Sequence, residues 1–255
     1  MEEKKEEMGR KKKLLPVWII AGVALLAAAV LFAGKTLFSW GGSRAEVGDL
    51  VTLGTYEQDN DYENGSEPLE WIVLKKDGKK ALLVTRYGIN NAHFDASSTL
   101  LDPDERVVSW ADCALRESLN SQEFLDSVFS PEEQEAILLT TITDEVNPET
   151  GTAPGAPSED KVFLLSISEA ERLFASDEDR KAVPTEYARE NGVFMMNKKT
   201  VTVQSCLWWL RSPGNAANKA AYIGTNGIIS YSGFIFNSER VALRPAVWVD
   251  LTKLR

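Results

Sequence analysis

Two cysteines and one histidine are the residues best suited to nucleophilic chemistry in this chain of 255 residues. A cysteine nucleophile needs a thiolate and a neighbouring base, so Cys113 or Cys206 would have to act together with His93. Cys113 falls beside the apolar stripe of an expected helix, where a small buried residue is typical. The sequence contains no G-x-S-x-G elbow, no P-loop and no dinucleotide-binding fingerprint. These observations favour a protein that is not an enzyme.

The same two cysteines have two structural interpretations. They lie 93 residues apart, and a disulfide between them would stabilise the fold by about 4–5 kcal/mol in the chain-entropy model. Such a bond is chemically allowed outside the cytoplasm, and two buried free thiols are the alternative. Neither cysteine has the spacing of a metal ligand, and a single histidine is too few for the usual zinc sites. No metal and no other cofactor is therefore expected.

A second group of residues has the chemistry of a binding surface, namely aromatic rings with polar handles beside amides and arginines. Its centre is the run WWLRSPG at residues 208–214. Adjacent residues on a strand point to opposite faces, so Trp208 and Trp209 are expected to serve two different surfaces. The candidates for ligand contact are Trp209, Arg211, Asn215, Asn218, Tyr222, Asn226, Tyr231 and Arg244.

The alternative is that these residues belong to the core and to turns. Arg211 precedes Ser212 and Pro213, and Arg244 directly precedes Pro245, so each arginine follows or lies within an expected strand and comes just before a proline. A guanidinium has five donors and no acceptor. If buried, it would bind carboxylates or the carbonyls that are freed where strands end. On this interpretation both arginines are structural anchors.

The elements that must position these residues follow the order strands, helices, strands. An Asp-Gly turn joins two strands at 69–74 and 81–87. One helix is expected from Ser109 to about Leu125, and two more begin with capping boxes at Ser130 and Ser168. Later strands are expected at 161–166, 200–203, 207–211, 220–223, 228–231 and 241–249. This order predicts the α+β class, with antiparallel strands and two or three helices.

The N-terminal part has the pattern of a membrane anchor. Residues 14–34 form an uncharged stretch of 21 residues, close to the roughly 20 that span a bilayer. Six Lys and Arg precede it, and such basic flanks stay in the cytoplasm. The sequence predicts a cytoplasmic tail over 1–13, a transmembrane helix over 14–38, a linker over 39–46 and one extracytoplasmic domain over 47–255. A signal peptide cleaved near residues 27–29 is the alternative.

The exterior part is acidic. Residues 44–255 hold 21 of the 28 Lys and Arg and 34 of the 38 Asp and Glu, which gives a net charge of −13. An acidic domain repels phosphate backbones and anionic headgroups, so no nucleic-acid partner is expected. The expected partners are the membrane, through residues 14–38, and a cell-wall glycan or a surface protein.

An ordered set of motifs resembles a family of bacterial surface domains with no assigned function, over about Val47 to Leu251. The motifs are VTLGTYEQ at 51–58, EWIVL at 70–74, Trp110, LR at 115–116, LN at 119–120, FS at 129–130, DKVFLLS at 160–166, WWLRSPG at 208–214 and RPA at 244–246. The resemblance implies an extracytoplasmic domain, often membrane-anchored, and it supplies no catalytic residues.

More remotely, the WWLRS and RPA segments are similar to the C-type-lectin-like fold and its formylglycine-generating relatives. This similarity implies a single C-type-lectin-like domain, and it makes an extracytoplasmic enzyme of the formylglycine-generating type the alternative function. The calcium-ligating Trp-Asn-Asp and Glu-Pro-Asn motifs of lectins are missing from the C-terminal region. The function expected from the sequence is therefore a membrane-anchored binding module without catalytic activity.

Overall fold

The structure, a computed structural model, describes residues 45–96, 108–196 and 204–254. All of these residues belong to the unit Leu37–Arg255. The expected tail over 1–13, the transmembrane helix over 14–38, most of the linker over 39–46 and the strand over 200–203 lie outside the described residues. Within the described ranges, every helix is too short or too polar to cross a membrane.

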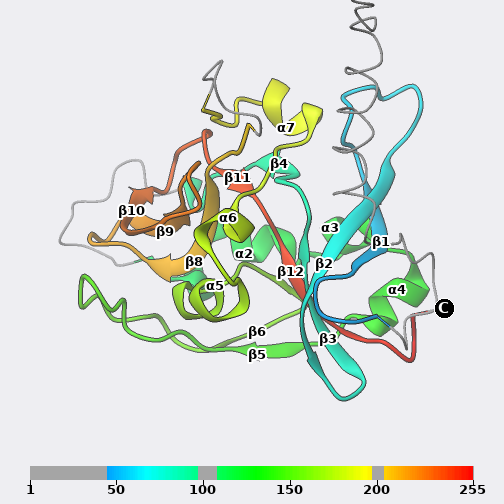
Figure 1. Cartoon of the computed structure of the whole chain (residues 1–255), viewed down its shortest axis with the longest axis horizontal. Coiled ribbons are helices and arrows are strands. Elements are labelled where there is room, and N and C mark those ends of the chain that lie inside the picture. Colours follow the sequence, from blue (N-terminus) through cyan, green and yellow to red (C-terminus); the bar gives the residue numbers. More distant parts are fainter. Residues whose placement is uncertain (1–44, 97–107, 197–203, 255) are drawn as a thin grey trace, which may run out of the picture. The chain divides into compact units, whose positions relative to one another are not determined.

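Two five-stranded sheets organise the described domain (Figure 1). The first has the order β1-β2-β3-β12-β7, the second has the order β10-β9-β8-β11-β4, and β5 pairs with β6 in a small third sheet. Neighbouring strands are antiparallel except for β11 and β8. The strands are β1 Leu50–Tyr56, β2 Glu67–Asp77, β3 Lys80–Thr85, β4 Asn90–Asn91, β5 Thr140–Ile142, β6 Ser158–Asp160, β7 Val162–Phe163, β8 Trp208–Pro213, β9 Lys219–Ile223, β10 Ile229–Ile235, β11 Ala242–Leu243 and β12 Ala246–Asp250. The α+β class and the β2–β3 hairpin are confirmed.

The helices are short, and the single helix expected from Ser109 to Leu125 is wrong. Cys113 and Ser121 both have extended backbone, and each accepts a hydrogen bond as the N-cap of a new helix. The described helices are η3 Trp110–Asp112, α2 Ala114–Leu119, α3 Gln122–Val128, α4 Pro131–Ala136, α5 Ile167–Leu173, α6 Asp177–Arg180 and α7 Glu186–Glu190. Residues that cap helices thus interrupt an apolar pattern that, taken by itself, favoured one longer helix.

One of the two expected capping boxes is confirmed and the other is displaced by two residues. Ser130 begins α4 as expected, with Glu133 as the reciprocal partner. The box of α5 joins Ser166 and Glu169, whose side chains and backbone amides exchange hydrogen bonds. The predicted box from Ser168 to Glu171 is wrong because Ser168 is already helical. As a consequence, neither side chain is used to cap the helix.

The core lies around the double tryptophan at the start of β8. Trp208 and Trp209 are both fully buried. Trp208 packs near Phe174, with ring centroids 6.3 Å apart, whereas Trp209 packs near Phe94 at 5.7 Å. The two rings therefore serve different parts of the core, as expected for neighbours on a strand.

The last expected strand, over 241–249, is in fact two strands in different sheets. β11 belongs to the second sheet and β12 to the first, so the chain passes from one sheet to the other at Arg244 and Pro245. Proline lacks the amide that would continue the ladder. The closing Arg-Pro-Ala segment is therefore the crossing point between the sheets.

Candidate functional site

Three of the predicted ligand contacts lie inside the protein. Trp209 is fully buried, and its Nε1 donates to the Ala92 carbonyl at 2.8 Å. Arg211 is 3% exposed and Arg244 is 0% exposed. None of the three side chains offers surface to a ligand, because each is enclosed by the fold and hydrogen-bonded within it. The structure gives them the alternative role, as part of the core.

The remaining predicted contacts are not gathered into one site. Asn215 precedes β9 and Asn226 follows it, so these two exposed amides lie at opposite ends of that strand. Asn218 and Tyr222 are partly buried, and the Tyr222 ring packs edge-on against Phe234. Only Tyr231 adjoins a pocket, as described below.

Arg244 links the two sheets at the point where the chain crosses between them. Its Nε donates to the Thr85 carbonyl at the end of β3 at 2.9 Å, and its Nη1 donates to the Arg180 carbonyl at 3.2 Å. The guanidinium lies 4.7 Å from the Trp208 ring centroid and 5.6 Å from that of Phe174. Burial lowers the pKa of Arg244 to about 10, so the group remains charged at neutral pH.

Arg211 joins three segments through a buried ion network. Its Nε lies 2.7 Å from Asp144 Oδ1, and its Nη1 donates to Glu169 Oε2 at 2.5 Å. It also donates to the carbonyls of Leu164 and Thr143. Burial raises the pKa of Asp144, against the opposing effect of the nearby Arg211 charge. The arginine therefore fixes the loop after β5 and the start of α5 on the strand β8.

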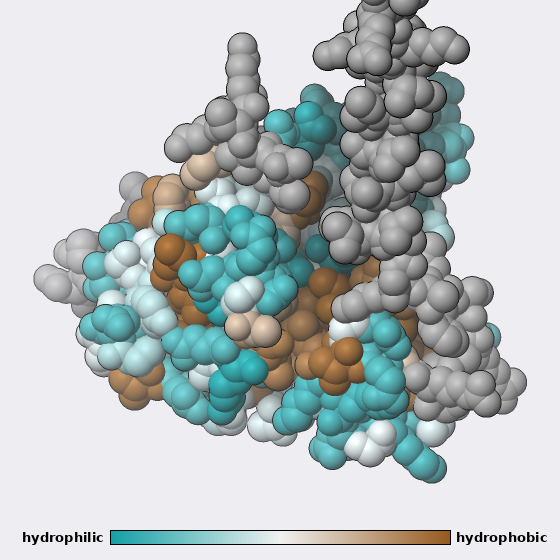
Figure 2. Space-filling view, viewed as in Figure 1, coloured by the Kyte–Doolittle hydropathy of each residue, from teal (hydrophilic) through white to brown (hydrophobic). Residues whose placement is uncertain are grey.

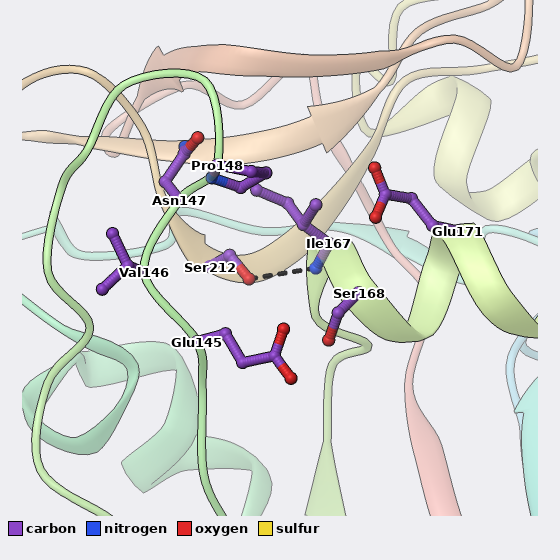
Figure 3. A pocket seen from close by; sticks show the side chains of 8 residues that line it. All are labelled: Glu145, Val146, Asn147, Pro148, Ile167, Ser168, Glu171 and Ser212. Carbon is purple, nitrogen blue, oxygen red and sulfur yellow. Dashed lines mark hydrogen bonds between the residues drawn. The ribbon is translucent and has the colours of Figure 1, made fainter.

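A pocket of about 110 Å³ lies next to this network (Figure 3). Three residues of its wall, Glu145, Ser168 and Ser212, are chain neighbours of the three charged residues of the network. The loop supplies one side of the pocket, and α5 and β8 supply the other. The lining residues are Glu145, Val146, Asn147, Pro148, Ile167, Ser168, Glu171 and Ser212.

The buried side-chain amide of Asn147 holds the loop that forms one wall of the pocket. Asn147 is 1% exposed, and its Nδ2 donates to the carbonyls of Pro213 and Tyr231. Its Oδ1 accepts from the amides of Glu149 and Thr150. One side chain thus ties the loop to β8 and β10 while it shapes the loop itself. A buried amide with its hydrogen bonds satisfied in this way rigidifies the segment that it joins.

The other wall is fixed by hydroxyl groups. Ser212 Oγ accepts from the amide of Ile167 at 3.0 Å. The hydroxyl of Tyr231 donates to Glu171 Oε1 at 2.5 Å at the edge of the pocket. Burial and then this hydrogen bond raise the pKa of Tyr231 to about 12. The Glu171 carboxylate is therefore held in place by a phenol that stays protonated at neutral pH.

A separate group of carboxylates could hold a metal ion. Glu57, Asp59 and Glu67 place ligand oxygens within 4.8 Å of one another at the loop that joins β1 to β2. Their oxygens already accept from loop groups, among them the amides of Gln58 and Asp61. These hydrogen bonds give the cluster a structural role in shaping the loop.

The two cysteines are free thiols in separate parts of the core. Cys113 Sγ donates to the Trp110 carbonyl, and Cys206 Sγ donates to the Ala182 carbonyl, each at 3.3 Å. Of the two interpretations of these cysteines, the structure therefore has the free thiols. Burial raises the pKa of both thiols to about 12. Neither is a thiolate at neutral pH, and His93 is instead placed 3.4 Å from Glu239.

The buried thiols predict a loss of stability in alkali. Between their ordinary pKa of 9.0 and the folded value of about 12, the folded state keeps protons that the unfolded state releases. Stability therefore falls as the pH rises through this range, by about 1.4 kcal/mol per pH unit for each thiol. We expect urea denaturation at about pH 8 and about pH 10 to show this loss.

The control for this experiment is the double variant Cys113→Ala, Cys206→Ala, compared with itself at both pH values. Its loss between about pH 8 and about pH 10 should be smaller than that of the wild type by about 2–3 kcal/mol. This difference separates the thiols from the other groups that titrate in alkali. An equal loss in both proteins would contradict the prediction.

The fold and the pocket define a mixed α+β domain with a small acidic cavity, and Figure 2 shows hydrophilic residues over much of the described surface on one face. By sequence, residues 70–251 match the family described as Domain of unknown function (DUF6273), and the chain belongs to that family. The match begins within β2, so β1 lies outside it. No curated protein and no solved structure matches the chain.

Sequence reasoning missed most residues of the pocket. The sequence analysis places Ser168 and Glu171 in a capping box, and it names neither Glu145 nor Asn147 as a candidate for ligand contact. One usable signal was the charge of Arg211, because a buried guanidinium requires acceptors nearby. Asp144 and Glu169 are the carboxylates that pair with it, and Glu145 and Glu171, close to them in sequence, line the pocket.

Proposed function

We propose that this protein is a membrane-anchored extracytoplasmic binding module without catalytic activity, and that the pocket beside α5 is its ligand site. The observation that carries the proposal is the construction of the pocket. Its walls come from three segments far apart in sequence, and the buried Arg211 network and Asn147 fix them to one another. A site of this kind is formed before its ligand arrives, which reduces the ordering required on binding.

The cysteines support the non-catalytic assignment. An enzyme of the formylglycine-generating type would need reactive thiols, whereas Cys113 and Cys206 are buried with their pKa raised to about 12. We further propose a C-type-lectin-like arrangement for the domain, on the similarity of the WWLRS and RPA segments. The two largely antiparallel sheets, one of which contains β8, are consistent with this arrangement.

The location follows from the N-terminal sequence. Basic residues precede the uncharged stretch over 14–34, and this pattern supports a single span with the tail in the cytoplasm. The domain would then face the cell wall of a bacterium. Its net negative charge disfavours nucleic acid as the partner, and we propose cell-wall material or a surface protein instead.

Filling the pocket tests this function. We propose to measure co-sedimentation of the full-length protein, in detergent, with purified bacterial cell walls. The substitution Ser168→Phe places a ring at the lining of the pocket and should weaken binding at least tenfold. The matched control is Ser118→Phe on α2, an exposed serine that does not line the pocket.

The proposal is supported if the wild type and the Ser118→Phe protein both bind cell walls and the Ser168→Phe protein does not. Circular dichroism of both variants checks that the fold is kept. The proposal fails if the wild type does not sediment with cell walls, or if the Ser168→Phe protein binds them as tightly as the wild type.

A further inference from the structure

We infer that the pocket binds the alkylammonium end of a lysine-type side chain in a peptide. This inference rests on the proposed function and names the ligand of the same site. It begins from the size of the pocket, about 110 Å³. A cavity of about 150 Å³ in another protein holds a benzene ring. The present cavity is smaller, so it accommodates the end of an aliphatic chain and leaves a bulkier sugar ring at its mouth.

The lining has the two kinds of surface that such a chain requires. Val146, Pro148 and Ile167 supply apolar contacts suited to methylene groups. Glu145 and Glu171 supply carboxylates, and Figure 3 shows these two acids entering from different sides, one from the loop and one from α5. An ammonium has three donors and no acceptor, which suits a pocket that is lined by carboxylates.

The local charge also favours a cation. Arg211 is already paired with Asp144 and Glu169 below the pocket. Glu145 has no ion-pair partner among the described residues. Within the part of the chain that the structure describes, Glu171 accepts one side-chain hydrogen bond, from the neutral phenol of Tyr231.

One cation does lie near the rim. Arg172 Nη2 donates to Ser168 Oγ at 3.4 Å. A second guanidinium, that of Arg180, acts on Tyr231, but it is paired with Asp177. The two lining carboxylates therefore outnumber the unpaired cation, and the pocket remains negative. Glu145 and Glu171 are both exposed, and charges of one sign that line a pocket attract a ligand of the other sign.

Serine hydroxyls complete the set of possible partners. Ser212 is 3% exposed and lines the pocket, and its Oγ accepts from the Ile167 amide. Ser168 contributes a second hydroxyl at the first turn of α5. Each hydroxyl retains a lone pair that can accept from an ammonium. The polar groups are therefore mainly acceptors, the opposite of what a carboxylate or phosphate ligand would need.

The test is calorimetric titration of the full-length protein with Nα-acetyl-L-lysine amide. Its Nε-acetylated form and the norleucine analogue keep the chain and remove the charge, and both should bind at least tenfold more weakly. Glu145→Gln and Glu171→Gln should each weaken binding of the lysine compound at least fivefold. Glutamine at position 171 can still accept from Tyr231, so the fold should be kept. The matched control is Glu117→Gln, an exposed glutamate on α2.

Cadaverine distinguishes a peptide side chain from a free diamine. Binding of the lysine compound at least fivefold tighter than cadaverine supports the peptide source, and equal or tighter binding of cadaverine overturns it. Equal binding of the lysine compound and its Nε-acetylated form overturns the inference as a whole. If Ser168→Phe still abolishes cell-wall binding in that case, the ligand class is wrong while the proposed function stands.

Discussion

Replacing Arg244 with alanine is expected to lower the free energy of unfolding by about 3–5 kcal/mol. The substitution removes the guanidinium donor from the carbonyls of Thr85 and Arg180. Trp208 Nε1 still donates to the Arg180 carbonyl, so the lost hydrogen bonds cost about 1–3 kcal/mol, mainly at Thr85. It also opens a cavity between the rings of Trp208 and Phe174. The loss is a large part of the roughly 5–15 kcal/mol that a domain has.

Urea denaturation of the full-length protein measures this effect. Arg244→Lys should recover little, because an ammonium lacks the planar fork and the ring stacking of a guanidinium. The matched control is Arg240→Ala, an exposed arginine that lies over the Phe194 ring, for which we expect at most about 1 kcal/mol. Wild-type stability of the Arg244→Ala protein would show that this arginine is not an anchor.

Arg211→Ala is expected to lower the free energy of unfolding by a similar amount for a different reason. Here the arginine has two carboxylate partners, and its removal leaves Asp144 and Glu169 close together without a counter-charge. Breaking a buried ion network by removing one partner costs about 3–5 kcal/mol. Because the network fixes the walls of the pocket, binding to cell walls should be lost as well.

Two further variants make this prediction specific. Arg189→Ala breaks an exposed pair with Glu186, and should cost at most about 0.5 kcal/mol. The triple variant Arg211→Met, Asp144→Asn, Glu169→Gln removes all three charges and should recover part of the lost stability. If Arg211→Ala instead folds with wild-type stability and only loses binding, the arginine faces the ligand.

The sequence predicted the kinds of element better than their limits. The Asp-Gly turn between two β-rich runs identified the β2–β3 hairpin. The Ser-Pro-Glu-Glu sequence identified the start of α4. The division of residues 109–125 into three helices was not predictable from apolar spacing, because the breaks depend on backbone conformation at Cys113 and Ser121. The same holds for the crossing at Arg244, since a local pattern cannot tell which sheet a strand joins.

The pocket was less predictable than the fold. Trp209 and Arg211 mark the correct strand, but the sequence could not tell whether they face a ligand or the core. The decision depends on acceptors supplied from elsewhere in the chain, such as Asp144 and Glu169. Pocket residues such as Asn147 are recognised only when the loop is seen against β8 and β10.

The place of β12 in the first sheet has a consequence for the order of folding. β12 lies between β3 and β7 and pairs with both, yet it is the last strand of the described chain. Pairings between segments so far apart in sequence form slowly. Until β12 arrives, β3 and β7 each have an open edge that another chain could pair with. On the extracytoplasmic location proposed above, the domain would complete this sheet only after nearly all of it had crossed the membrane, and it would depend until then on protection from aggregation.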